Sequence, residues 1–128
     1  MNEKVKYWTE LSEYDIKTAE AMLQSKRYLY VGFMAHQAIE KILKACFVKV
    51  TDKTAPFSHS LSFLAKQSDM YKSFSEEQKD FIDLLEPMNI EARYPTHKKQ
   101  LMESLTEKRC TKILNNAQEL QKWIIKKL

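Results

Sequence analysis

The chain has 128 residues, which is the length of one domain and enough to bury a hydrophobic core without disulfides or metal. It contains one glycine and three prolines, so the backbone has few places to turn and many residues that favour helix. The net charge of +4 comes from lysines interleaved with Asp and Glu, as on solvated helix faces rather than in a nucleic-acid-binding stripe. These features predict a single all-α domain spanning residues 1–128.

The sequence contains neither a membrane segment nor a metal-ligand motif. Residues 1–8 lack the apolar core of a signal peptide, and no run of about 18 apolar residues is present to cross a bilayer. Cys46 and Cys110 lie far apart without CxxC spacing, so neither a disulfide framework nor a metal site is expected. We therefore expect a soluble cytoplasmic protein that uses no metal, no cofactor and no membrane.

Five helices are predicted from the apolar periodicity and from the residues that begin and end helices. Pro56 ends the connection after the second helix, and Ser58 can cap a short third one. Ser75 and Gln78 form a capping box for the fourth helix, and Thr106 caps the last. The expected ranges are 3–25, 29–50, 59–69, 76–89 and 106–128.

Four of these helices are long and are joined by short connections, with the short helix at 59–69 as a spacer. This arrangement predicts an antiparallel up-and-down bundle whose core comes from the four long helices. The helix at 29–50 is apolar over more of its circumference than packing on one side requires. The surplus apolar surface favours a second interface, so we expect a homodimer.

A polar set interrupts the apolar stretch "FMAHQAIEKILKACF" at 33–47. His36, Gln37, Glu40 and Lys44 fall within about a quarter-turn arc of a helix, and Lys41 lies beside them. In one interpretation His36 and Glu40, four residues apart, form an ordinary surface pair worth a few tenths of a kcal/mol. In the other, the arc is half of a binding site.

Asp15 lies inside the apolar stripe of the first helix. A carboxylate in such a position costs free energy unless it is paired, so we expect a partner from another helix. Lys41, Arg93 and His36 are the candidates, and the pair is either structural or part of a site.

Three stretches together resemble one family. "YDIKTAEAML" at 14–23, "FMAHQAIEKILKACF" at 33–47 and "EARYP" at 91–95 stand in the order and approximate spacing of the HEPN family, the higher-eukaryote and prokaryote nucleotide-binding domain. The short "FSHSLSFLA" at 57–65 also fits. The resemblance implies a small antiparallel helical bundle, similar to nucleotidyltransferase substrate-binding domains, that commonly dimerises.

The resemblance also implies partners and a site. HEPN proteins are often encoded beside, or fused to, a minimal nucleotidyltransferase, and many are toxins of toxin–antitoxin pairs. The "ARYP" stretch is similar to the nucleotidyltransferase-associated branch, which implies a nucleotide- or RNA-binding subunit that works with a separate nucleotidyltransferase. The candidate binding residues are Arg93, Tyr94, His36, Glu40, Lys41 and Lys44.

Some family members cleave RNA without metal by means of an Arg and a His. Arg93 and His97 take these places here, but only three residues separate them, a shorter interval than in the family motif, and Pro95 lies within it. The residue types suit the chemistry, because a guanidinium binds phosphate oxygens with two prongs and an imidazole transfers protons near neutral pH. Two alternatives therefore stay open: a metal-independent endoribonuclease that uses Arg93 and His97, and a non-catalytic module whose polar arc is a dimer seam.

Overall fold

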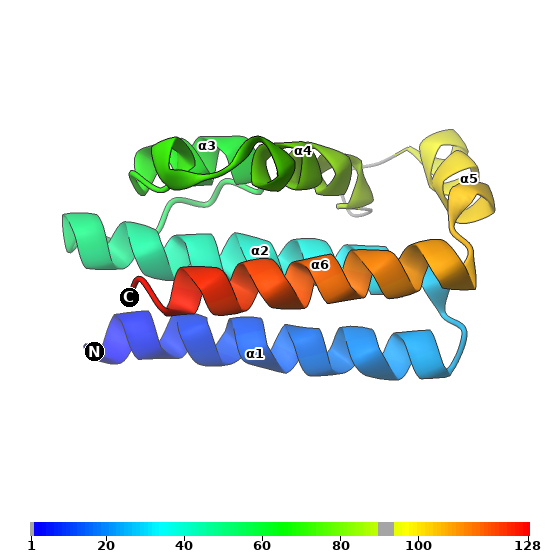
Figure 1. Ribbon diagram of the computed structural model, residues 1–128, viewed down its shortest axis with the longest axis horizontal. Helices are drawn as coiled ribbons and strands as arrows, with labels where there is room; N and C mark the ends of the chain where they lie inside the picture. Colours follow the sequence, from blue (N-terminus) through cyan, green and yellow to red (C-terminus); the bar gives the residue numbers. More distant parts are fainter. Residues whose placement is uncertain (1, 90–93) are drawn as a thin grey trace.

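The computed structural model describes residues 2–89 and 94–128, and all regular structure in this part of the chain is helical (Figure 1). The predicted all-α class is therefore confirmed. Two single-turn 3-10 helices are η1 (Tyr71–Ser73) and η2 (Glu86–Met88). The α-helices are α1 (Glu3–Gln24), α2 (Tyr28–Thr51), α3 (Leu61–Gln67), α4 (Glu76–Leu85), α5 (Pro95–Ser104) and α6 (Glu107–Ile125).

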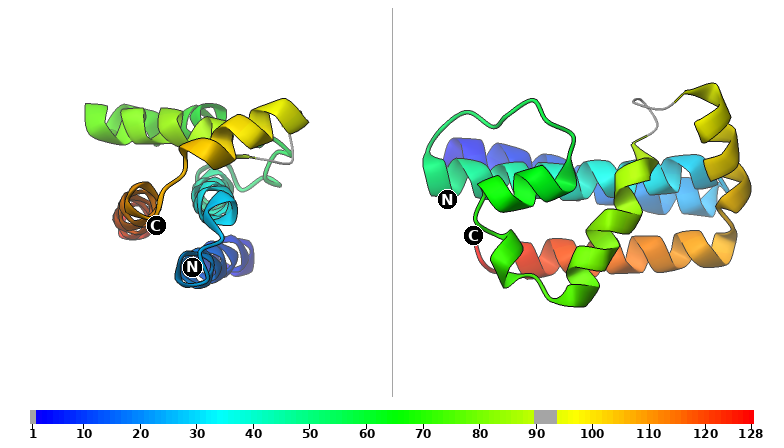
Figure 2. Two further views of the ribbon diagram at one scale, coloured as in Figure 1. Left: turned by 90° about the vertical axis from the view of Figure 1, so that its right-hand side faces the viewer. Right: turned by 90° about the horizontal axis from the view of Figure 1, so that it is seen from above.

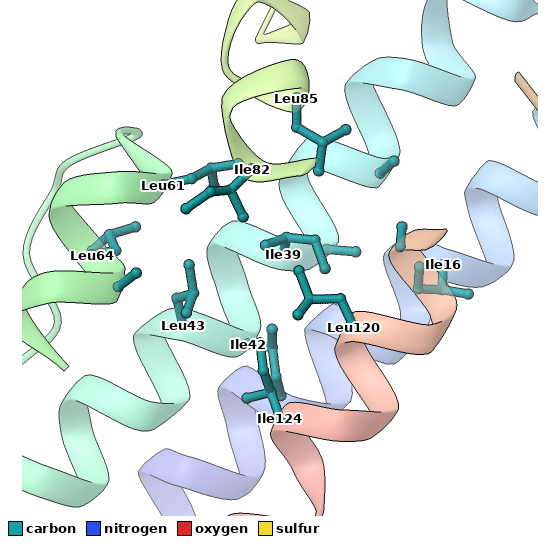
Figure 3. Packing of buried hydrophobic residues seen from close by; sticks show 14 of the residues in the cluster. Ile16, Ile39, Ile42, Leu43, Leu61, Leu64, Ile82, Leu85, Leu120 and Ile124 are labelled. Carbon is teal, nitrogen blue, oxygen red and sulfur yellow. The ribbon is translucent and has the colours of Figure 1, made fainter. Parts of the chain in front are cut away.

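Three long helices, α1, α2 and α6, pack against one another and run the length of the molecule (Figures 1 and 2). The short helices α3, α4 and α5 form a second layer that lies over α2 and α6. The core fills the space between the layers: Ile39 of α2 meets Leu120 of α6, while Ile82 and Leu85 of α4 close it from above (Figure 3). All four side chains are buried.

Local capping residues set several helix starts. Ser75 and Gln78 form the predicted capping box, and Thr106 accepts a hydrogen bond from the Arg109 backbone N–H, so both predictions are confirmed. The third helix is capped by Ser60 and not by Ser58. The Ser58 hydroxyl instead accepts a hydrogen bond from the Ser60 N–H in the turn before the helix. Helix α3 therefore begins at Leu61, two residues later than expected.

Two features of the second layer add to the sequence-based expectation. The fourth helix ends at Leu85 and Pro87 lies in η2, as expected of a proline, which should kink or end this helix. Helix α4 runs obliquely across the long helices (Figure 2). An additional helix, α5, occupies the segment expected to be a connection. Pro95 occupies its first turn, where a proline is well tolerated. Because α5 buries none of its residues, its sequence carries no apolar period by which to predict it.

The wide apolar circumference of α2 is explained within one chain. This helix contacts α1, α6, α3, η2 and α5, and thirteen of its residues are buried. The surplus apolar surface thus serves the second layer of the same molecule and does not by itself require a dimer seam. Within residues 2–89 and 94–128, no helix is both long and apolar enough to cross a bilayer.

Gly32 permits the close approach of η2 to α2. A Cβ atom at this position would lie 2.8 Å from the Met88 sulfur, and the Met88 side chain is fully buried. We expect Gly32→Val to lower the free energy of unfolding by about 1–3 kcal/mol through overpacking, despite the better helix propensity of valine. Urea denaturation measures this loss. Adding Met88→Ala should recover part of it, and a single variant as stable as the wild type would contradict the close contact.

Candidate functional site

The polar residues of α2 meet in the interior around Glu40. One Glu40 carboxylate oxygen accepts a hydrogen bond from Lys44 Nζ at 3.0 Å, and the other lies 3.0 Å from His59 Nδ1 and 3.8 Å from His36 Nδ1. His36, Glu40 and Lys44 are only 0%, 3% and 6% exposed. The interpretation of His36 and Glu40 as a surface pair is therefore wrong, because the second layer covers this side of α2.

Two further contacts join this cluster to neighbouring elements. A Glu86 carboxylate oxygen in η2 lies 4.0 Å from His36 Nε2, and the other oxygen accepts from the Ser62 N–H in the first turn of α3. Lys44 Nζ lies 5.4 Å from the centre of the Trp8 ring of α1, a cation–π distance. We call His36, Glu40, Lys44, His59 and Glu86 the Glu40 cluster. It connects α2 to the loop before α3, to α3 and to η2.

Asp15 is paired with Lys41, one of its three candidate partners. The Lys41 Nζ and an Asp15 carboxylate oxygen are 2.6 Å apart, and Asp15 is buried while the Lys41 side chain is 23% exposed. Burial raises the pKa of the Asp15 carboxyl above its usual value, and the hydrogen bond and charge of Lys41 oppose that rise. Lys41 therefore supports the α1–α2 interface, which limits its availability to a ligand.

A second buried polar contact at this interface was not predicted. The Ser12 hydroxyl donates to the Ala38 carbonyl at 2.6 Å and accepts from the Gln121 side-chain amide at 2.9 Å. The three residues lie on α1, α2 and α6, so one hydroxyl links all three long helices. Ser12 and Gln121 lie on apolar helix faces, as Asp15 does. A polar residue in such a position predicts a buried polar contact, and this feature of the sequence could have identified both residues.

Tyr94 and His97 lie together at the start of α5. Tyr94 directly precedes the helix, His97 is in its first turn, both are exposed, and their rings meet edge to face with centres 6.2 Å apart. Arg93 lies outside the described residues. A cavity of about 360 Å³ runs along one face of α5, from His97 in its first turn to Ser104 at its end, and is lined by Pro87, His97, Gln100, Leu101 and Ser104.

The residues expected in one cleft therefore fall into two groups. His36, Glu40 and Lys44 lie in the interior, where each Glu40 carboxylate oxygen already has a partner, while Tyr94 and His97 line the surface of α5. The first turn of α5 offers backbone N–H groups without helical partners, and Lys98 and Lys99 add positive charge. This group can hold an anion beside two rings.

The described residues offer neither a metal site nor a reactive thiol. No three His, Cys, Asp or Glu side chains within residues 2–89 and 94–128 are placed to share a metal ion. Cys46 is buried, and burial raises the pKa of its thiol to about 12. The thiol therefore stays protonated at neutral pH and is inert as a nucleophile.

Three long helices, a central helix with a buried polar cluster and a layer of short helices define a small all-α bundle domain. The HEPN domain family matches residues 5–128, and the chain belongs to this family. The chain is also similar in fold to TT1696 from Thermus thermophilus, a crystal structure, with a TM-score of 0.82 over 99% of this chain and 100% of that one, at 20% sequence identity. No curated protein matches the chain.

Proposed function

We propose that this HEPN domain is the nucleotide- or RNA-binding subunit of a cytoplasmic two-protein system, and that its partner is a separate minimal nucleotidyltransferase. The pairing with a nucleotidyltransferase rests on the resemblance of the "ARYP" stretch to that branch of the family. A homodimeric state and the role of toxin in a toxin–antitoxin pair rest on the resemblance to the HEPN family as a whole. The observation that carries the binding function is the cavity along α5, which His97 lines at its first turn, with the Tyr94 ring packed edge to face against His97.

Each part of this surface suits one part of a nucleotide. The first turn of α5, with Lys98 and Lys99 beside it, attracts phosphate. The exposed Tyr94 ring offers a face on which a base can stack. Arg93, which precedes Tyr94 in the sequence, supplies a permanent planar cation that binds two phosphate oxygens at once.

Arg93→Ala should weaken the binding of nucleotides or short RNAs by at least about tenfold, because a charge-assisted two-pronged contact is lost. Arg93→Lys should keep part of the affinity, since a point charge cannot reproduce that geometry. The measurement is a titration of nucleoside phosphates and short RNAs against the purified protein. Arg27→Ala is the matched control, because it removes an exposed arginine that does not line the cavity beside His97. Equal affinity of Arg93→Ala and wild type would contradict the proposal.

The same samples test the ribonuclease alternative, for which the exposed position of His97 is the favourable observation. RNA is incubated without metal and its products are followed. Cleavage lost in both Arg93→Ala and His97→Ala would assign the two residues as a catalytic pair. We expect instead that His97→Ala leaves binding almost unchanged.

The partner is tested separately. The product of a neighbouring nucleotidyltransferase reading frame, where one is present, is expressed with this chain, and light scattering of the purified mixture gives its stoichiometry. A complex that contains both chains supports the two-protein system. Separate elution of the two chains at tens of micromolar would contradict it.

A further inference from the structure

A second hollow lies away from α5, where the start of α4 crosses the C-terminal half of α6 (Figure 2). Its volume is about 330 Å³. Phe81 of α4 and Leu120 and Trp123 of α6 form the apolar part of its lining, and the polar part comes from Ser75, Glu77, Gln78, Asn116 and Glu119. Neither the Glu40 cluster nor the α5 surface contributes a residue to this groove.

Three polar side chains of the groove have no partner among the described residues. Glu77 and Glu119 are exposed carboxylates, and Asn116 is a half-buried carboxamide. No hydrogen bond or ion pair within residues 2–89 and 94–128 engages any of them. By contrast, the adjacent Glu76 pairs with Lys79. The groove thus combines an apolar lining with two free negative charges in a protein of net charge +4.

We propose that this groove receives an arginine side chain from an extended segment of a partner protein. A guanidinium donates two parallel hydrogen bonds to a carboxylate, and such charge-assisted pairs are stronger than neutral ones. The methylene groups of the arginine cover the apolar surface of Phe81, Leu120 and Trp123. The two carboxylates also give the groove a local negative charge that attracts a basic segment in a protein of net charge +4.

Asn116 favours a peptide over a free polyamine as the source of the cation. Its carboxamide has both a donor and an acceptor, so it can bond to the N–H and the carbonyl of a peptide main chain. A polyamine at neutral pH has donors only and leaves the Asn116 donor unused. The Trp123 ring face is already approached by Lys127 Nζ at 4.5 Å, so the carboxylates, rather than a cation–π contact, are the main attraction for the incoming cation.

The test is an NMR titration of the full chain with the peptide acetyl-Gly-Arg-Gly-amide. We expect shifts concentrated at the Trp123 indole N–H and at α4, with a dissociation constant on the order of 1 mM, as suits a single side chain. The peptide with Lys in place of Arg should bind more weakly. Spermidine and guanosine serve as the free-cation and neutral-base probes, and both should bind more weakly than the arginine peptide.

The double variant Glu77→Gln/Glu119→Gln should weaken peptide binding by at least about tenfold. Both side chains are exposed, so the fold should be retained, as circular dichroism can verify. The matched control is Glu13→Gln/Asp83→Asn, which makes the same change of charge at exposed sites outside the groove. Equal loss in the control, tighter binding of spermidine or guanosine, or no localised shift at Trp123 would overturn the proposal.

Discussion

Glu40→Leu should lower the free energy of unfolding by about 3–5 kcal/mol, the loss typical of a buried ion pair that has lost one partner. The reason is the position of Lys44, whose side chain is 8% exposed and whose ammonium is held by the Glu40 carboxylate. Without that carboxylate the charge stays buried and unpaired. His59 loses the same acceptor, but its side chain is 55% exposed and can bond to water. Urea denaturation at neutral pH measures the loss.

Two controls separate this effect from a general loss of packing. Glu40→Leu/Lys44→Met removes both charges and should recover much of the stability, because a well-packed apolar pair often replaces a buried ion pair without loss. Glu10→Leu removes one member of the exposed Lys6–Glu10 pair and should change stability by less than about 1 kcal/mol. A single Glu40→Leu variant as stable as the wild type would mean that Lys44 reaches water.

Lys41→Met should have the next largest effect, about 3 kcal/mol at neutral pH. The change removes the cation that lies 2.6 Å from the Asp15 carboxylate, whose side chain is only 6% exposed. The carboxylate would then be buried without a charge partner. Lys41→Met/Asp15→Asn removes both charges and should restore most of the loss, as a double-mutant cycle measured by urea denaturation can determine.

The effect of Lys41→Met should also depend on pH in a defined direction. Burial already raises the pKa of Asp15 in the folded protein, and Lys41 opposes the rise, so its removal raises this pKa further. A group whose folded pKa lies above its unfolded value binds a proton more readily in the folded state than in the unfolded state. Protonation of this group therefore favours folding at low pH, and this stabilisation is lost as the pH rises through the folded pKa.

The stability difference between Lys41→Met and the wild type should therefore narrow as the pH falls from neutral toward the usual Asp value of 3.8. Protonation neutralises the Asp15 carboxylate, and the variant then no longer has a buried charge without a partner. Lys41→Met/Asp15→Asn lacks this titrating group and should show no such narrowing. A constant difference between the single variant and the wild type over this range would contradict the assignment of the loss to Asp15.

The Glu40 cluster links stability to the proposed binding surface. Through His36 and Glu86 it connects α2 to η2, and η2 precedes residues 90–93 and α5 in the chain. The close contact of Gly32 with Met88 holds η2 at the same place. The Glu40 cluster and the Gly32–Met88 contact thus help to hold η2, the last described element before the segment that carries Tyr94 and His97.

Local signals in the sequence were sufficient for the helical class, the first two helices and several helix starts. The capping box at Ser75 and Gln78 and the Thr106 cap involve residues three apart, so their chemistry is readable without a fold. The resemblance of the stretches at 14–23, 33–47 and 91–95 to the HEPN family was also readable from the sequence, and the family is confirmed over residues 5–128.

The tertiary structure alone decided what covers each helix face. Helical periodicity placed His36, Glu40 and Lys44 on one arc, but whether that arc meets water or the second layer depends on α3 and η2, which come later in the chain. The choice of Lys41 as the partner of Asp15 depends in the same way on the packing of α1 against α2. The groove between α4 and α6 is lined by residues about forty positions apart in the chain. Helix α5 buries none of its residues, so the sequence has no apolar stripe that predicts it. A period along the chain records which residues share a face, whereas the partner of that face is set by contacts between distant segments.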